Sequence, residues 1–175
     1  LAGPWSLDRG KVEQLCGDTL TLCDGPMRLG PGVFTSGAIP RISELDPKFS
    51  APVRLQGDQI KPDSLDDDMA LVINLAGSGL VVITGCCHAG VFNTLAAAQN
   101  LFPDQPLHTL FGGLHLNFVD QARLETIITE LGESPISWFA PIHCTGAEAS
   151  QNMRTALPQR TVFSTTGMML CLGEK

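Results

Sequence analysis

The hydrophobic pattern becomes regular after the first 65 residues. Residues 69–76 and 80–84 are apolar runs of strand length, and Gly77-Ser78-Gly79 between them predicts a β-hairpin. Apolar residues at helical spacing after Gly90 and after Asp120 predict two helices, and Asp120 has the chemistry of a helix N-cap. The rest of the pattern predicts strands over 107–111 and 136–142, a helix over 147–156 and a terminal hairpin over 161–172.

The first 65 residues are rich in glycine, proline and aspartate. Apolar pieces over 18–23 and 32–34 predict two short strands separated by turn-forming residues. Four prolines between Pro40 and Pro62 predict a long loop, and long loops in compact domains tend to line sites. The order of elements therefore predicts one layered α/β domain, with a loop-rich entry over 1–65 and a regular part over 66–175.

Composition narrows the classes of protein that fit. With 43% hydrophobic and 17% charged residues the chain is globular, and its net charge of -7 argues against a nucleic-acid partner. The longest apolar run, over 79–84, is too short to span a membrane, so we expect no membrane partner. Six unevenly spaced cysteines indicate reduced thiols and a cytoplasmic protein. The start at Leu1 suggests a partial chain.

Three histidines follow apolar strands at their C-terminal ends: His88, His115 and His143. Ligands bind beyond the carboxyl ends of strands in open α/β sheets, and neutral imidazole is a common metal ligand. We therefore predict that His88 and His143 bind a metal, while His115 is either a ligand or part of a substrate-contacting loop beside Gly113. His108 lies inside its strand and is expected to be structural.

Cysteines flank the same strand ends. Cys86, Cys87 and Cys144 are small hydrophobic residues in one interpretation and zinc-binding thiolates in another. A cysteine nucleophile with His115 or His143 as its base is a third interpretation. The spacing of these residues does not decide between them.

Carboxylates and backbone turns add further candidates. Asp66-Asp67-Asp68 either forms a solvated turn or supplies one oxygen ligand to a metal. Only one of Asp67 and Asp68 could be that ligand, because they face opposite sides if the strand has begun. The turn from Gly85 to Gly90 leads a strand into a helix, where free N–H groups favour an anion. After His143, Thr145 is a candidate helix cap.

Five ordered motifs carry a resemblance to a known family. They are residues 31–41 (PGVFTSGAIPR), 67–73 (DDMALVI), 80–90 (LVVITGCCHAG), 112–116 (GGLHL) and 141–146 (PIHCTG). Together they resemble the branch of the metallo-β-lactamase superfamily known as dihydropterin ribofuranosylaminobenzene-phosphate synthase-like metal-dependent hydrolases. The chain departs from this branch at Met69, Cys87, Leu114 and Ile142, and keeps every histidine.

The resemblance implies the C-terminal half of an αββα sandwich. It places His143 at the last metal-binding histidine and Cys86 at the position of the bridging aspartate, which His88 would then replace. The His-x-His-x-Asp-His motif, which supplies most ligands in the superfamily, does not occur in these residues. The resemblance therefore implies that an N-terminal half is missing, and that the exposed sheet face pairs with that half or forms a homo-oligomer.

The function that these observations predict is that of a metal-dependent hydrolase or related transferase acting on a small anionic substrate, phosphate-bearing or pterin-like. Two divalent ions, zinc or alternatively manganese, are expected in the intact protein, and little activity in this chain alone. Metal ligands are His88, His143 and one of Asp67 and Asp68; His115 and Cys86 are catalytic; Gly85, Cys87, Gly113 and Thr145 bind substrate. The alternatives are a non-catalytic binding module and a cysteine-dependent enzyme.

Overall fold

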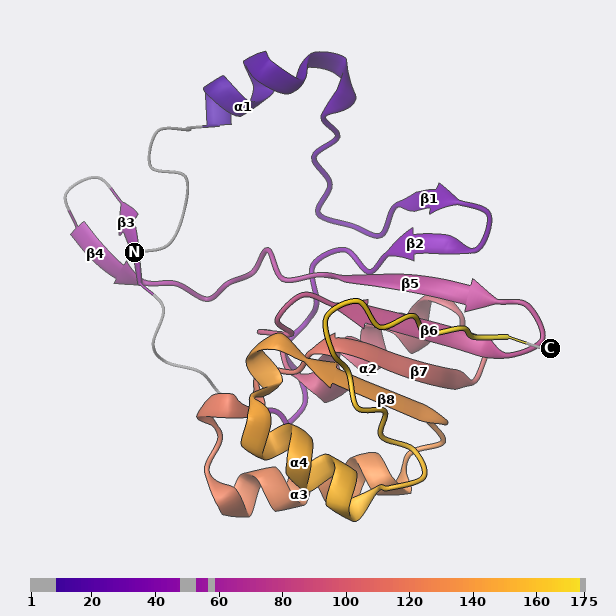
Figure 1. Ribbon diagram of the computed structural model, residues 1–175. Coiled ribbons are helices and arrows are strands. Elements are labelled where there is room, and N and C mark those ends of the chain that lie inside the picture. The colour runs from indigo at the N-terminus through magenta and orange to yellow at the C-terminus, as the bar shows by residue number, and fades with distance from the viewer. Residues whose placement is uncertain (1–8, 48–52, 57–58, 174–175) are drawn as a thin grey trace.

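The computed structural model describes residues 9–47, 53–56 and 59–173. Its centre is a mixed sheet in which, among the described residues, six strands follow the order β1-β2-β5-β6-β7-β8 (Figure 1). Neighbouring strands from β1 to β6 pair antiparallel, and β6, β7 and β8 pair parallel. The strands are β1 (Arg28–Gly30), β2 (Val33–Thr35), β5 (Ala70–Leu75), β6 (Gly79–Thr84), β7 (Leu107–Gly113) and β8 (Trp138–Ile142).

Helices connect and follow the parallel strands. These are α2 (Val91–Leu101), α3 (Gln121–Glu133) and α4 (Ala147–Ala156), and the Asp120 carboxylate caps α3 by accepting from the Arg123 N–H at 3.0 Å. One core cluster joins their buried side chains to those of alternate strand positions, such as Leu80, Val82 and Phe139. Because one face of the sheet supplies these side chains, the helices pack on that face.

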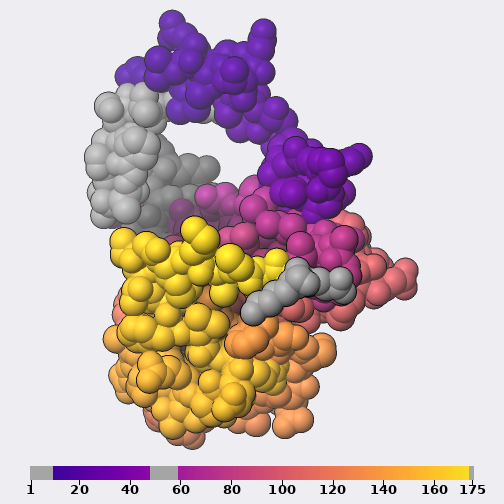
Figure 2. Space-filling model, turned by 45° about the vertical axis from the view of Figure 1, so that its right-hand side comes forward, coloured from indigo at the N-terminus to yellow at the C-terminus, as the bar shows by residue number. Residues whose placement is uncertain are grey.

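The opposite face of the sheet is less covered. Its strand residues Ile73, Ile83 and Phe111 are half-buried. The C-terminal segment, residues 162–173, runs back over this side of the molecule (yellow in Figures 1 and 2). A cavity of about 380 Å³ lies where residues 164–168 of this segment adjoin Phe111 and Ile142.

Two pieces lie away from the sheet (Figure 1): helix α1 (Arg9–Cys16), which leads into the short 3-10 helix η1 (Gly17–Thr19), and a hairpin of β3 (Val53–Gln56) and β4 (Gln59–Pro62). The strand predicted over 18–23 is wrong, because these residues begin in η1 and continue without regular structure. The loop predicted over 40–62 is wrong in part, since β3 and β4 pair there; residues 48–52 and 57–58 lie outside the described residues.

The hairpin of β5 and β6 and the helices α2, α3 and α4 confirm the elements predicted from periodicity. The terminal hairpin predicted over 161–172 is wrong. Thr161 forms an isolated parallel bridge with Phe139 of β8, and the described residues after it are irregular. The turn at Thr166-Gly167 therefore does not connect two paired strands.

Candidate metal centre

The carboxyl ends of three parallel strands meet at one edge of the sheet and supply the candidate site. The turns after β6, β7 and β8 contain Cys86 to His88, His115, and His143 with Cys144. The Gly113 N–H donates to the Gly85 carbonyl at 3.1 Å, which ties the first two turns together. A Cβ at Gly113 would lie 2.4 Å from the Gly85 oxygen and 2.8 Å from the Cys144 Sγ, so this close approach requires glycine.

Cys86, His143 and Cys144 form the group best placed to hold an ion. One ligand atom from each lies within 4.8 Å of the others. Among the described residues this is the only group of three or more histidine, cysteine, aspartate or glutamate side chains close enough to share an ion. Cys86 and Cys144 are half-buried and His143 is exposed. The Cys144 thiol donates to the Cys86 carbonyl at 3.3 Å, which orients it toward the first turn. The sequence left open whether Cys144 is a zinc-binding thiolate, and it was not among the predicted metal ligands.

The backbone of all three turns adopts the left-handed conformation at a residue other than glycine. The φ angles are 64° at Cys87, 50° at His115 and 51° at His143. This conformation is uncommon for such residues and clusters at functional sites, because the surrounding structure must hold it in place. Its recurrence at three adjacent strand ends supports a site that depends on how these side chains are directed.

His88 and His115 lie side by side next to this group. Their ring centroids are 4.6 Å apart at 88°, and the His115 ring also lies 5.2 Å from that of Phe118. Burial lowers the pKa of His115, electrostatic interaction with His88 and with His143 lowers it further, and Asp68 opposes the shift. His115 is therefore a neutral imidazole at neutral pH, the form that accepts a proton or binds a metal.

Of the two predicted aspartates, Asp68 lies at the site. Its Oδ2 accepts from the Ala89 N–H at 2.7 Å, next to His88, and its charge acts on His115. The Asp67 side chain is exposed and does not belong to the group able to hold an ion. Asp68 therefore positions the His88 turn, and a direct role for either carboxylate as a metal ligand stays a prediction.

Arg41 and Asp46, which sequence reasoning missed as site supports, fasten the long loop to the His88 turn. The Arg41 guanidinium donates to the His88 carbonyl and, at 2.8 Å, to the Ser64 carbonyl. The Asp46 carboxylate accepts from the Phe92 N–H at 3.0 Å and the Asn93 N–H at 2.7 Å at the start of α2. The motif at 31–41 contains Arg41, but no local pattern marks Asp46.

The start of α2 is therefore already occupied by a carboxylate of this chain. The Gly90 N–H donates to the Cys87 carbonyl, Ala89 to Asp68, and the first helical N–H groups to Asp46. These pairs leave fewer free N–H donors for an anionic ligand at the helix start, and the prediction that the turn holds one stays a prediction. The prediction that Gly85 contacts substrate remains untested.

Cys87 and Thr145 direct their side chains away from the candidate ligands. The Cys87 thiol is 2% exposed and lies 3.2 Å from the Thr94 Oγ1, and burial raises its pKa to about 12. The Thr145 hydroxyl is buried and accepts from the Leu114 N–H at 3.0 Å. The predicted capping role of Thr145 is wrong, since α4 follows Gly146 and has no side-chain cap. Any contact of either residue with substrate would need its backbone.

The chemistry of the three donors fits zinc. Two cysteine sulfurs and one imidazole are ligands that Zn²⁺ binds in proteins, and three protein ligands leave a fourth position for water or substrate. Soft thiolates do not suit manganese, which prefers oxygen ligands. Burial raises the pKa of Cys144 to about 11, so its thiol carries a proton at neutral pH until an ion displaces it.

This protonated thiol predicts that zinc binding strengthens with pH. Below its pKa Cys144 must lose one proton for each ion bound, so its contribution to the apparent affinity rises about tenfold per pH unit between roughly pH 7 and pH 9. Competition titrations with a chromophoric chelator at several pH values measure the slope. An affinity that does not change with pH over this range would exclude a protonated cysteine ligand.

Comparisons with known proteins place this geometry in a familiar fold. No family model matches the chain. Over 95% of its length it superposes, with a TM-score of 0.79 and 23% identity, on 63% of the crystal structure of Tm1679, a metal-dependent hydrolase of the β-lactamase superfamily. The chain has the fold of that structure. The resemblance indicated by the sequence motifs is thus confirmed at the level of the fold, in the mixed sheet and its helices.

Two curated relatives from Methanocaldococcus jannaschii are similar in sequence. One is 7,8-dihydropterin-6-methyl-4-(beta-D-ribofuranosyl)-aminobenzene-5'-phosphate synthase, 27% identical over 145 residues, which are 81% of this chain and 48% of that protein. The other is an uncharacterised protein, 29% identical over 130 residues, which are 74% of this chain and 46% of that protein. The chain spans about half the length of the curated relatives it matches. None of its described helices is long and apolar enough to cross a membrane.

Proposed function

We propose that this chain carries part of the active site of a zinc-dependent hydrolase, or a related transferase, acting on a small anionic substrate. The observation that carries the proposal is the Cys86, His143 and Cys144 group with the neutral His115 imidazole beside it. The similarity to a pterin-related synthase whose name includes a 5'-phosphate supports a phosphate-bearing or pterin-like substrate.

A zinc ion, when bound, would supply a Lewis acid and lower the pKa of water at its open position. The residues of this chain would do the rest. His143 and the two thiolates hold the ion, and Asp68 fixes the turn that carries His88. His115, neutral at the working pH, would take the proton of the attacking water and return it to the leaving oxygen.

A cysteine nucleophile fits these thiols less well. A nucleophilic cysteine needs a lowered pKa, so that the thiolate exists at neutral pH. Burial instead raises the pKa of Cys87 to about 12 and that of Cys144 to about 11. Neither thiol would be ionised without a metal, which argues against covalent catalysis by either and leaves metal binding as the role that fits Cys144.

Hydrolysis of bis(4-nitrophenyl) phosphate by the zinc-loaded protein tests the proposal. Water adds to phosphorus, the bond to one nitrophenolate breaks, and the leaving oxygen takes the proton that His115 holds. Because the chain carries only part of the proposed active site, we expect a low turnover, which a chelator abolishes and zinc restores. His115→Gln is expected to lower turnover by about a hundredfold or more at unchanged zinc content, the usual size of a general acid–base contribution.

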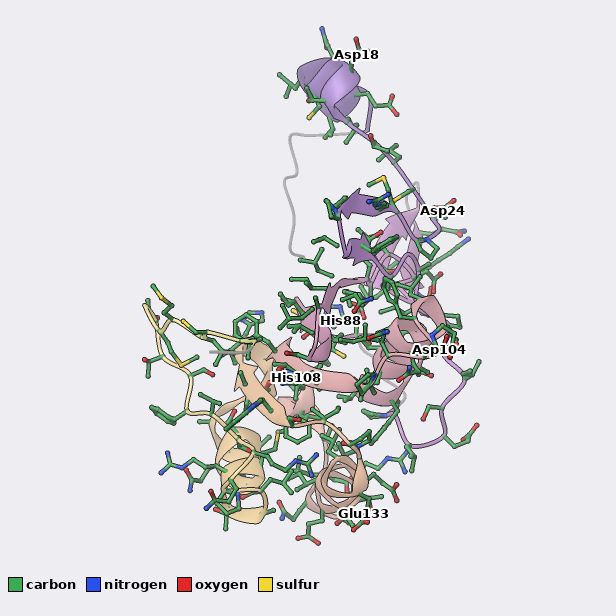
Figure 3. The ribbon with its side chains drawn as sticks, turned by 90° about the vertical axis from the view of Figure 1, so that its right-hand side faces the viewer. Asp18, Asp24, His88, Asp104, His108 and Glu133 are labelled. Carbon is green, nitrogen blue, oxygen red and sulfur yellow. The ribbon has the colours of Figure 1, made fainter. Side chains whose placement is uncertain are left out.

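His108→Gln provides the matched control. His108 sits at the opposite end of β7 from His115, with its Nδ1 2.8 Å from the Thr109 hydroxyl, and is labelled apart from His88 in Figure 3. Its replacement should leave turnover within about twofold of the parent protein, as expected for a residue away from the reacting atoms. Turnover that withstands the chelator, or equal losses in both variants, would contradict the proposal.

A further inference from the structure

A groove of about 510 Å³ extends from the candidate metal centre along α4. Its floor and sides come from the end of β8, from one face of α4, and from the C-terminal segment over 161–164. His143 lies in its lining, so the groove begins at the ion-binding group. Figure 3 shows α4 and the C-terminal segment near the same edge of the sheet, beside β8. This volume falls in the range of small-molecule sites.

The α4 residues that line this groove recur at helical spacing, so they lie on one face of the helix. Ala147, Ser150, Gln151 and Arg154 line the groove, while Ala149 and Met153 turn into the core. At 1.5 Å per residue, Arg154 lies about 10 Å along the helix axis from Ala147, which follows the cluster. A ligand reaching both ends would therefore have the length of an aromatic ring with substituents.

Among the described residues that line the groove, Arg154 is the one whose side chain carries a permanent positive charge. In a chain of net charge -7 it forms no ion pair within the described residues; its guanidinium lies instead 5.4 Å from the centroid of the Phe163 ring. Other arginines, such as Arg41 and Arg160, donate their guanidinium hydrogen bonds to backbone carbonyls. Arg154 is thus available to an anion, beside an exposed aromatic face.

The Ser164 hydroxyl points to a ligand independently of Arg154. Its oxygen is shielded from solvent and has no hydrogen-bond partner among the described residues, although Ser164 lines the groove. Leaving such a group unpaired is costly, so a bound molecule gains a hydrogen bond that the protein alone does not make when the Ser164 side chain turns toward the groove.

Charge balance at the cluster gives a reason for a separate anion site. Two thiolates would cancel the charge of a bound Zn²⁺, and the N–H groups at the start of α2 are already paired. We propose that the groove binds an aryl compound with an anionic substituent, the anion on Arg154 and the ring against Phe163, with its other end at His143. This inference rests on the proposed function for its chemistry, but not for the binding itself.

Binding of phenyl phosphate to the zinc-free protein, measured by calorimetry, tests the groove without the metal. We expect saturable one-to-one binding that is at least about tenfold tighter than that of inorganic phosphate, because the ring adds stacking and apolar burial. Arg154→Gln should weaken it about ten- to hundredfold through the lost charge-assisted hydrogen bonds. Phe163→Ala should weaken it about three- to tenfold.

Arg28→Gln is the charge-matched control, because Arg28 is exposed on β1, far from α4 in Figure 1. It should leave the affinity unchanged, and circular dichroism confirms that each variant is folded. The proposed binding site would be contradicted by any of three results: no binding of phenyl phosphate, equally tight binding of inorganic phosphate, or unchanged affinity in Arg154→Gln. If binding follows the expected pattern but the protein shows no zinc-dependent turnover, the groove stands and the proposed function fails.

Discussion

Replacing Cys144 by alanine is expected to weaken zinc binding by more than about a hundredfold. Losing a direct ligand should exceed the ten- to hundredfold cost of losing a supporting contact around a metal. Cys144 supplies one of the three ligand atoms that lie within 4.8 Å of one another. Its loss leaves two ligand atoms of the group, from Cys86 and His143, to hold the ion. Competition with a chromophoric chelator measures the affinity.

Two comparisons make this result specific. Cys86→Ala should cause a loss of similar size, because both sulfurs belong to the same group. Cys171→Ala removes an exposed thiol outside this group and should leave the affinity unchanged. Zinc that binds Cys144→Ala as tightly as the parent protein would show that the ion lies elsewhere.

Replacing Asp46 by alanine is expected to lower the free energy of unfolding by about 2–4 kcal/mol. The carboxylate accepts from the N–H groups of Phe92 and Asn93, and each hydrogen bond to a charged group contributes roughly 1.5–3 kcal/mol. Alanine cannot accept hydrogen bonds and would leave both donors without this partner. Urea denaturation followed by circular dichroism measures the change.

Asp46→Asn separates the charge from the hydrogen bonds. Burial raises the pKa of Asp46, so keeping this carboxylate charged is costly, and a neutral amide removes that cost while keeping one acceptor oxygen. We expect about half the loss seen with alanine. Asp104→Ala, at an exposed loop position, is the control and should change stability by less than about 0.5 kcal/mol. A loss for Asp46→Ala no larger than this control would contradict the capping role.

Most of the regular part of the fold follows from periodicity. The hairpin of β5 and β6 and the helix α3 with its Asp120 cap are encoded by neighbouring residues, because each depends on local turn or capping chemistry. The β3 and β4 hairpin and the irregular C-terminal segment are not. Their strand content depends on which partner lies nearby, and no local pattern states that.

The site was predictable in its location but not in its ligand set. Histidines after β6, β7 and β8 had to meet at one edge once the strands ran parallel. The left-handed backbone at Cys87, between Cys86 and His88, and at His143, next to Cys144, changes the side-chain directions in both turns, and the apolar pattern does not predict such a conformation. Asp46 and Phe92 of α2 are 46 residues apart in the sequence, so no local pattern predicts that the Asp46 carboxylate pairs with the start of this helix.

X-ray absorption fine structure of the zinc-loaded protein tests the central claim most directly. The scattering shell around the ion should contain two sulfur atoms at about 2.3 Å and at least one imidazole nitrogen at about 2.0 Å. The sulfur contribution should halve in Cys144→Ala loaded with excess zinc. A shell made of nitrogen and oxygen alone would contradict a zinc centre held by Cys86, His143 and Cys144.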